Sequence, residues 1–137
     1  MTPGDPEIRE ILRKARRIAV VGLRDNPMRP AFGVAAYLKR VGYTIVPIHP
    51  RAETVLGERG YPDLESAALA GPIDIVDVFR RSDAIPALVP GCVAVRPLLV
   101  WLQLGIRNDA ALAELAAAGI PGVQDRCLAV DHQLMGL

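Results

Sequence analysis

The stretch VVGLRDNPMRPAFGVA, residues 20–35, decides the fold. It begins as a short apolar strand that runs into Gly22, which is how nucleotide-binding α/β proteins commonly begin. A dinucleotide-binding loop of the G-x-G-x-x-G type would then have two more glycines. This loop has two prolines and two arginines in their place. The stretch therefore predicts a strand, an anion-binding turn and a helix, without the usual dinucleotide-binding loop.

Strands and helices alternate along the rest of the chain. Short runs of apolar, often β-branched residues end at glycine, proline or polar residues and are separated by segments of helical pattern. The predicted strands span residues 17–22, 43–48, 73–79, 97–103 and 120–124. The predicted helices span residues 6–16, 32–40, 64–70, from 108 or 109 to 119, and 128–135, with one more after Ser82 that Pro86 and Pro90 interrupt or bound. Asp5 is the expected N-cap of the first helix.

This order predicts an α/β fold. Apolar strands that alternate with helices form a parallel sheet covered on both faces, and the crossovers between parallel strands are almost always right-handed. We expect a doubly wound, Rossmann-like sheet of about five strands. With 137 residues, no internal repeat and no linker, the chain is expected to form one domain, residues 1–137.

Composition excludes several classes of protein. Hydrophobic residues make up 51% of the chain, which is typical of a globular protein. The net charge of +1 gives no reason to expect nucleic acid or an anionic membrane as partner, and a protein partner is left open. No apolar run approaches the roughly 20 residues of a membrane span, and no signal peptide is evident, so we expect a cytoplasmic protein. Cys92 and Cys127 are expected to be reduced, and no cluster of metal ligands is present.

Arginine stands at three of the first four predicted strand ends. Arg24 follows the first strand, Arg51 the second and Arg80 the third, whereas Gln103 ends the fourth. In a doubly wound sheet, ligands bind beyond the carboxyl ends of the strands, where the strand order reverses. We therefore expect these side chains to converge at one edge of the sheet.

The first of these loops has the chemistry of an anion site. Gly22 lets a phosphate approach the backbone closely, and the helix after Pro30 directs its free amide groups and positive dipole end to the same place. Arg24 and Arg29 can each form bidentate contacts with phosphate oxygens. These features support an anion site but do not identify the anion.

The end of the second strand distinguishes between nucleotide cofactors. NAD-dependent enzymes have an acidic residue there that accepts hydrogen bonds from ribose hydroxyls. This chain has PIHPR at residues 47–51, and the nearest acid is Glu53. An arginine suits a ribose that carries a phosphate, as in NADP or coenzyme A. The missing G-x-G-x-x-G argues against NADP, so an NAD(P)-dependent oxidoreductase remains the alternative to a coenzyme A site.

Four segments of the chain carry a family resemblance: VVGLRDNPMRP…GVAAYLKRVGYTIVPIHPR, IDIVDVFRRSDAIP, VWLQLGI and GIPGVQDRCLAV. They resemble the small stand-alone CoA-binding proteins, which are related to the CoA-binding domain of the succinyl-CoA synthetase alpha subunit. The resemblance covers residues 7–134 and implies a Rossmann-like domain that binds coenzyme A or an acyl-CoA at the strand ends.

The resemblance also implies a set of cofactor-binding residues. Ordered by the part of the coenzyme that each would contact, they are Gly22, Leu23, Arg24 and Arg29 at the pyrophosphate, Ile48, His49, Pro50 and Arg51 at the adenosine end, Val78, Phe79 and Arg80 as a wall beside the adenine or pyrophosphate, and Gln103 near the pantetheine arm. His49 departs from the family, because the small proteins more often have asparagine at this position.

No catalytic residues are predicted. The synthetases need a phosphorylated histidine from a further domain, and neither His49 nor His132 stands in the matching context. Cys127 and His132 are five residues apart on a predicted helix and would point in different directions. We therefore expect a binding module without chemistry of its own. His132 is expected on the surface of the last helix.

Other polar and aromatic positions are assigned structural roles. Trp101 lies in an apolar strand and is expected in the core. Asp74 and Asp77 are an odd number of residues apart on a strand, so they face opposite sides and cannot form an acid–base pair. Asp125 and Arg126 are expected to form a local ion pair or a helix cap.

Overall fold

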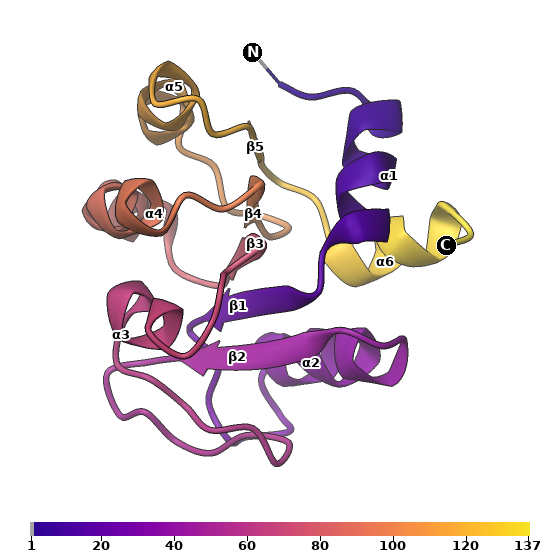
Figure 1. Ribbon diagram of the computed structural model, residues 1–137, viewed down its shortest axis with the longest axis vertical. Helices are drawn as coiled ribbons and strands as arrows, with labels where there is room; N and C mark the ends of the chain where they lie inside the picture. Colours follow the sequence, from indigo (N-terminus) through magenta and orange to yellow (C-terminus); the bar gives the residue numbers. More distant parts are fainter. Residues whose placement is uncertain (1) are drawn as a thin grey trace.

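The computed structural model describes residues 2–137, in which helices and strands alternate (Figure 1). The strands are β1 (Arg17–Val21), β2 (Thr44–Ile48), β3 (Ile75–Val78), β4 (Leu99–Leu102) and β5 (Gly122–Val123). The helices are α1 (Asp5–Lys14), α2 (Pro30–Arg40), α3 (Leu64–Ala68), the 3-10 helix η1 (Ser82–Leu88), α4 (Val89–Val95), α5 (Asp109–Ala117) and α6 (Leu128–Leu134). All five predicted strands are present, each within the predicted range.

The strands form one parallel sheet in the order β2–β1–β3–β4–β5. The chain moves from β1 outward to β2 and then returns to the other side of β1 to form β3, so the order reverses between β1 and β3. Val21, at the end of β1, lies in register with Ile48 of β2 and with Val78 of β3. These strands therefore end at the same edge, and the predicted doubly wound, Rossmann-like α/β fold is confirmed.

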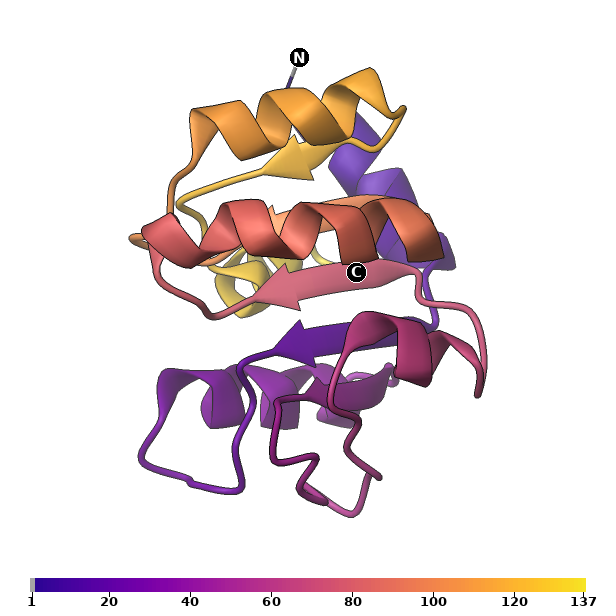
Figure 2. The ribbon, with the colours of Figure 1, turned by 90° about the vertical axis from the view of Figure 1, so that its left-hand side faces the viewer.

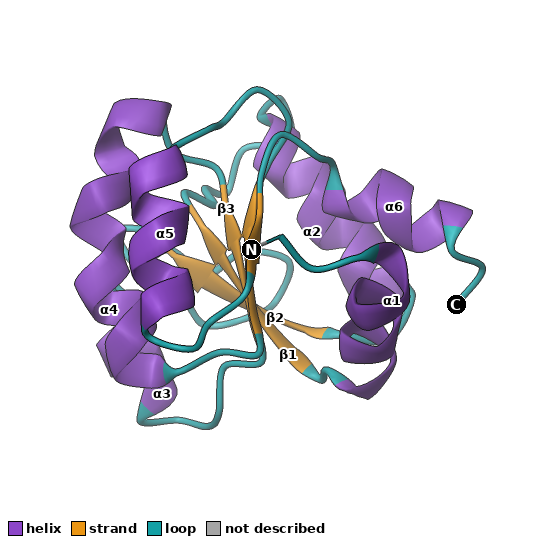
Figure 3. Cartoon of the chain, turned by 90° about the horizontal axis from the view of Figure 1, so that it is seen from above, coloured by secondary structure: helices purple, strands orange, loops and turns teal. Residues whose placement is uncertain are grey.

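Helices cover both faces of the sheet. Figure 2 shows α3, α4 and α5 side by side over one face, and Figure 3 shows α1, α2 and α6 on the other. Contacts between α3 and α4, between α4 and α5, and between α2 and α6 hold each layer together. No helix in residues 2–137 combines the length and the apolar character that crossing a membrane requires.

Alternate residues of β1 supply two separate cores. Ile18 and Val20 belong to the cluster under α1, α2 and α6, whereas Ala19 and Val21 belong to the cluster under α3, α4 and α5. Because both faces are buried, the strand reads as an uninterrupted apolar run instead of alternating with polar residues. Burial of each side chain of this kind, from valine to leucine in size, contributes about 1.5–3 kcal/mol.

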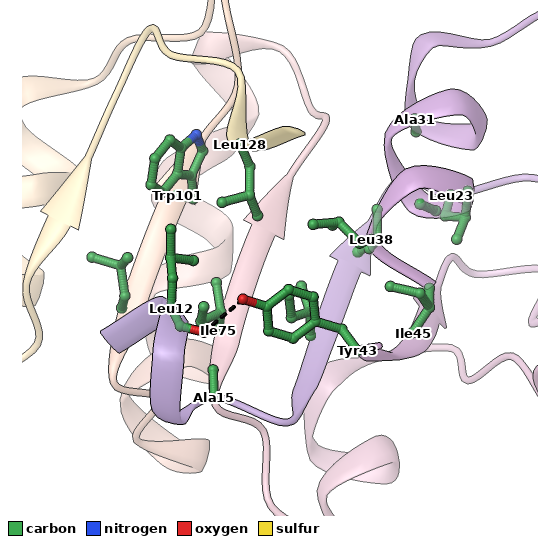
Figure 4. Close-up of a cluster of buried hydrophobic side chains, with 14 of the residues drawn as sticks. Leu12, Ala15, Leu23, Ala31, Leu38, Tyr43, Ile45, Ile75, Trp101 and Leu128 are labelled. Atoms are coloured by element: carbon green, nitrogen blue, oxygen red, sulfur yellow. Dashed lines mark hydrogen bonds between the residues drawn. The ribbon is translucent and has the colours of Figure 1, made fainter. Parts of the chain in front are cut away.

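The core under α1, α2 and α6 includes two aromatic side chains whose polar atoms are satisfied (Figure 4). The indole nitrogen of fully buried Trp101 donates to the main-chain oxygen of Arg126 at 2.8 Å. The hydroxyl of Tyr43 donates to the main-chain oxygen of Leu12 at 2.6 Å. The prediction that Trp101 is a core residue is confirmed.

Two helix starts differ from the prediction and one agrees with it. Asp5, which was expected to be the N-cap, is instead the first residue of α1. The N-cap residue is Gly4, and no side chain caps this helix. The helix expected after Ser82 begins as η1, with Pro86 inside it, because proline lacks the amide that an α-helical hydrogen bond needs. Of the two residues expected to begin the fifth predicted helix, Asn108 and Asp109, it is Asn108 that caps α5, accepting a hydrogen bond from the amide of Ala111 at 2.9 Å.

The expectation that His132 lies on the surface is wrong. Only 5% of the residue is exposed, and its Nδ1 forms a hydrogen bond of 2.7 Å with the hydroxyl of Tyr37. The side chain of His132 therefore points inward from α6, toward Tyr37 of α2. The short apolar pattern of residues 128–135 did not reveal which face of α6 packs against α2.

The expected pairing of Asp125 with Arg126 is also wrong. Asp125 has a φ of +57°, and its Oδ1 accepts a hydrogen bond from the amide of Gly105 at 2.7 Å. Arg126 instead forms ion pairs with Asp131 at 2.6 Å and with Asp5 at 3.1 Å. The left-handed turn at Asp125 directs the two neighbouring side chains to different partners.

Asp74 and Asp77 differ in their hydrogen bonding. Asp74 lies before β3 and accepts hydrogen bonds from the amides of Arg16 and Arg17 at 2.7 and 2.9 Å. Asp77 lies within β3 and is fully buried, and neither of its carboxyl oxygens has a hydrogen-bond partner. Burial raises the pKa of Asp77 well above its ordinary value, because an apolar environment disfavours the charged form.

Asp77 should make the protein less stable as the pH rises. The folded state retains a proton that the unfolded state releases above the ordinary pKa of 3.8, so the free energy of unfolding falls from that pH upward. The slope is at most about 1.4 kcal/mol per pH unit for one proton. Asp77→Asn removes this titrating group. The free energy of unfolding of the wild type, measured by urea unfolding, should therefore fall relative to that of the variant as the pH increases. A difference that does not vary with pH would contradict the burial of an unpaired carboxyl.

Candidate functional site

A cavity of about 540 Å³ opens where the strand order reverses, and we call it the switch-point pocket. Its walls come from the ends of β1, β3 and β4 and from the beginnings of α2 and α6. The lining residues are Gly22, Arg29, Pro30, Ala31, Val34, Phe79, Arg80, Arg81, Gln103, Leu104, Ile106 and Cys127. The pocket lies at the edge of the sheet where the strand ends were expected to form a site.

Gly22 allows the ends of β1 and β3 to approach each other. It has a φ of +95°, and a Cβ atom at this position would lie 2.5 Å from the main-chain oxygen of Phe79. Any side chain would therefore push the two strand ends apart, in addition to the backbone strain. The glycine was predicted to make room for a ligand, and the structure shows that it also makes room for β3.

The start of α2 faces the pocket without a side-chain cap. Pro30 is the first residue of the helix, which begins two residues before the predicted start at Phe32, and Arg29 is the N-cap residue. Arg29 forms no capping hydrogen bond, and the first turn contains no acidic residue. The positive end of the helix dipole is therefore not neutralised by the chain's own side chains, and an anion in the pocket would be stabilised by it.

Arg24 is held by an acidic residue from the loop after β2. Its Nε donates to Oε1 of Glu53 at 2.7 Å, and the amide of Asp25 donates to the same oxygen at 3.2 Å. The hydrogen bond from Arg24 and then the one from Asp25 lower the pKa of Glu53 to about 2. The sequence placed Glu53 as the nearest acid beyond the second strand, and in the structure the chain turns back after β2 and brings Glu53 to the first loop.

The turn after β2 lies beside the switch-point pocket without lining it. It contains His49, Pro50 and Arg51, and Nδ1 of His49 accepts a hydrogen bond from the amide of Arg51 at 3.1 Å. Burial lowers the pKa of His49, and the positive charges of Arg24 and Arg80 lower it further. His49 is therefore a neutral hydrogen-bonding group at neutral pH, and its Nδ1 fixes the shape of the turn.

The predicted residues fall into three groups. Five of them line the pocket together: Gly22, Arg29, Phe79, Arg80 and Gln103. Leu23, Ile48 and Val78 have buried side chains, so only their main-chain atoms could contact a ligand. Arg24, His49, Pro50 and Arg51 are not among the lining residues.

Sequence reasoning missed the apolar part of the pocket. Val34, Leu104, Ile106 and Cys127 line it, and they come from α2, the loop after β4 and the residue before α6. One signal could have found part of this wall, because Leu104 is an apolar residue in the loop after a buried strand; in the structure it is 70% exposed. Val34 gave no signal, since an apolar residue on an amphipathic helix is normally a core residue.

Gln103 connects the pocket to α6. It is 4% exposed, and its Oε1 accepts a hydrogen bond from the amide of Leu128 at 3.1 Å. This contact fixes the first turn of α6 against the end of β4, next to Cys127.

The two cysteines are both free, but Cys92 is buried, and burial raises the pKa of its thiol to about 12.

The pocket combines positive charge with apolar surface. Arg29, Arg80 and Arg81 supply three guanidinium groups, whereas Val34, Leu104 and Ile106 supply aliphatic surface. Neither an aspartate nor a glutamate of residues 2–137 lines it. Such an arrangement suits a ligand with an anionic group at one end and an uncharged chain at the other.

Comparison with known proteins identifies the family. The model of the CoA binding domain family matches residues 16–133. The chain belongs to the CoA binding domain family. The resemblance noted in the four sequence segments is thereby confirmed at the level of the family.

Relatives of similar length cover nearly the whole chain. The uncharacterized protein YneT of Bacillus subtilis is 37% identical over 130 residues, which is 95% of each protein. The solved structure of protein ID.343 from Thermus thermophilus is 42% identical, with a TM-score of 0.90 over 97% of this chain and 99% of that one. A hypothetical protein from Pyrococcus horikoshii is 31% identical, with a TM-score of 0.90 over 98% of this chain and 94% of that one.

The ion pair between Arg24 and Glu53 can be tested by titration. The Glu53 carboxyl should titrate near pH 2 in the wild type, and Arg24→Gln should move the midpoint toward the ordinary value of 4.5. The contribution of the pair to stability is accordingly present above pH 4.5 and is lost as the pH falls toward 2. Carbon-13 NMR of the side-chain carboxyl measures both midpoints. Arg51→Gln removes a nearby charge without removing the hydrogen bond, and an equal shift in that variant would contradict the assignment.

Proposed function

We propose that this protein binds coenzyme A or an acyl-CoA in the switch-point pocket, without catalysing a reaction of its own. The observation that carries the proposal is the position of the pocket, at the reversal of strand order where doubly wound sheets bind nucleotides. Membership of the CoA binding domain family supports the choice of ligand.

The two halves of the pocket match the two halves of the coenzyme. Coenzyme A joins a pyrophosphate to a long, uncharged pantetheine arm. Arg29 and the positive end of the α2 dipole would bind the pyrophosphate. Leu104 and Ile106 would contact the pantetheine arm, and Gln103 has an amide with which the amides of that arm could form hydrogen bonds.

The adenosine end would lie over the turn after β2. Arg51 is exposed in this turn and could contact the 3′-phosphate, the group that distinguishes coenzyme A from dephospho-CoA. The hydrogen bond between Nδ1 of His49 and the amide of Arg51 holds the turn in a fixed shape. Nδ1 of His49 is therefore already occupied, which leaves Nε2 for a ligand.

The lining of the pocket supports binding without catalysis. Cys127 is the one nucleophilic side chain among the described lining residues, and no histidine, aspartate or glutamate lines the pocket to act as its base. His132 is committed elsewhere, through the hydrogen bond of its Nδ1 to Tyr37. A thiol without an adjacent base is a poor catalyst of acyl transfer.

An NAD(P)-dependent oxidoreductase is the second candidate. The observation that favours it is the position of Glu53, which stands close to where such enzymes have the acidic residue that binds ribose hydroxyls. Against it, Oε1 of Glu53 already accepts hydrogen bonds from Arg24 and from the amide of Asp25, and the loop lacks the glycines of the dinucleotide motif. Coenzyme A therefore remains the better match.

A thermal-shift panel separates the two candidates. Coenzyme A or acetyl-CoA at 100 times its Kd should add about 2.7 kcal/mol to the free energy of unfolding, which corresponds to roughly 10 °C in Tm for a domain of this size. NAD, NADP and ATP should produce much smaller shifts at equal concentration. A shift with NADP and none with either coenzyme A compound would overturn the proposal in favour of the oxidoreductase.

Two arginine variants test the placement of the coenzyme. Arg51→Ala should weaken coenzyme A binding by about tenfold and leave dephospho-CoA nearly unaffected, because one charge-assisted contact to the 3′-phosphate is lost. Arg29→Ala is the matched comparison and should weaken both ligands by a similar factor, since both contain the pyrophosphate. Isothermal titration calorimetry measures the four affinities. Equal losses of both ligands in Arg51→Ala would refute the contact with the 3′-phosphate.

A further inference from the structure

A second cavity, of about 590 Å³, lies at the opposite edge of the sheet, where β1 and β2 begin. We call it the opposite-edge pocket. It is bordered by α1, by the end of α2 and by α6, so it shares no lining residue with the switch-point pocket. Its lining residues are Arg9, Leu12, Arg13, Ala15, Arg16, Val41, Gly42, Tyr43, His132, Gly136 and Leu137.

Three arginines give this pocket a concentrated positive charge. Arg9 and Arg13 are four residues apart and lie on the same side of α1, and Arg16 follows the end of the helix; all three line the pocket. Among the described residues, neither aspartate nor glutamate lines the pocket. A ligand would therefore meet three guanidinium groups and no negative side chain.

Within residues 2–137, the guanidinium groups of these arginines form one ion pair, between Arg13 and Glu10, and otherwise donate to main-chain oxygens. Arg9 donates to the main-chain oxygen of Met135, and Arg16 donates to the main-chain oxygens at the end of α1, the nearest of which is that of Ala15 at 3.1 Å. Those acceptors are uncharged. Arg13 has one acidic partner, Glu10, at 3.8 Å, and both side chains are largely exposed. Exposed ion pairs of this kind contribute little.

A buried histidine adds a directional donor to the pocket. His132 is 95% buried, and its ring lies edge-on to the rings of Tyr37 and Tyr43, with centroids 5.5 and 5.6 Å away. When the hydroxyl of Tyr37 donates to Nδ1, the ring proton resides on Nε2. In the part of the chain that the structure describes, Nε2 has no hydrogen-bond partner, and His132 is one of the residues that line the pocket.

We propose that the opposite-edge pocket binds a small anion with two or more negative charges, carried by phosphoryl or carboxylate oxygens. The guanidinium groups of Arg9, Arg13 and Arg16 would supply the attraction, and Nε2 of His132 would donate a hydrogen bond to one oxygen of the ligand. Tyr37 is a positioning residue, because it sets which nitrogen of His132 carries the proton. The proposal does not depend on the ligand of the switch-point pocket.

The two histidines of the chain allow both edges of the sheet to be observed at once. The full-length protein is titrated with inorganic pyrophosphate at low ionic strength, and the ring nitrogens are followed by NMR. His132 reports the opposite-edge pocket, and His49 reports the edge that holds the switch-point pocket. We expect a saturable shift of Nε2 of His132. A shift confined to His49, or no saturable shift of His132, would overturn the proposal.

Two variants of α1 separate specific binding from general attraction by charge. Arg13→Gln should weaken the binding that His132 reports by about tenfold, the loss of one hydrogen bond to a charged group. Lys14→Gln is the matched control, since it removes an equal charge from the adjacent exposed position, outside the pocket, and should change the affinity less than twofold. Equal losses in the two variants would overturn the proposal.

Tyr37→Phe and a second anion complete the test. The phenyl ring preserves the packing of Tyr37 and removes the hydroxyl, so Nδ1 of His132 loses its partner; we expect weaker anion binding together with an altered tautomer signal in the nitrogen spectrum. Unchanged affinity would remove His132 from the site and overturn the proposal as stated. Citrate distinguishes the sources of charge: saturation by pyrophosphate alone supports a phosphoryl ligand, and saturation by both supports any multiply charged anion.

Discussion

The contact between Gly22 and Phe79 is the constraint on which the rest of the structure depends. β1 and β3 are neighbours in the sheet, and beyond their ends a Cβ on Gly22 would lie 2.5 Å from the main-chain oxygen of Phe79, so there is no room for a side chain. This close approach joins the two halves of the sheet at the point where the strand order reverses. It also places the start of α2 above the end of β3, which is how Arg29 and Arg80 come to line one pocket although 51 positions separate them in the sequence.

The first loop is held from a neighbouring strand as well as by its own prolines. Glu53 accepts hydrogen bonds from Arg24 and from the amide of Asp25, so an acidic residue beyond β2 determines where the loop after β1 lies. The cost of this arrangement is that Arg24 is partly neutralised before any ligand arrives. The positive charge that lines the pocket comes instead from Arg29, Arg80 and Arg81. Arg24 therefore shapes the loop, whereas the arginines that line the pocket are the ones available to contact a ligand.

The sequence predicted the fold well because β1 and its neighbours are buried on both faces. Uninterrupted apolar runs ended by glycine or proline leave few alternatives to a parallel α/β sheet. The polar edge was also predictable, since topology alone places Gly22, Arg29 and Gln103 together. What could not be predicted depended on contacts between segments far apart in the chain. The return of Glu53 to the first loop requires a positive φ at Ala52, and the inward orientation of His132 requires Tyr37 on the facing helix. No local pattern encodes either contact.

The different environments of the two cysteines have a practical consequence. Cys92 is a buried residue of α4, and its raised pKa keeps it as an unreactive thiol, whereas Cys127 lies half-buried in the wall of the switch-point pocket. An alkylating reagent added to the native protein would therefore modify one sulfur and spare the other. The attached group would occupy the same space as a bound ligand, so the rate of alkylation becomes a direct measure of whether the pocket is filled.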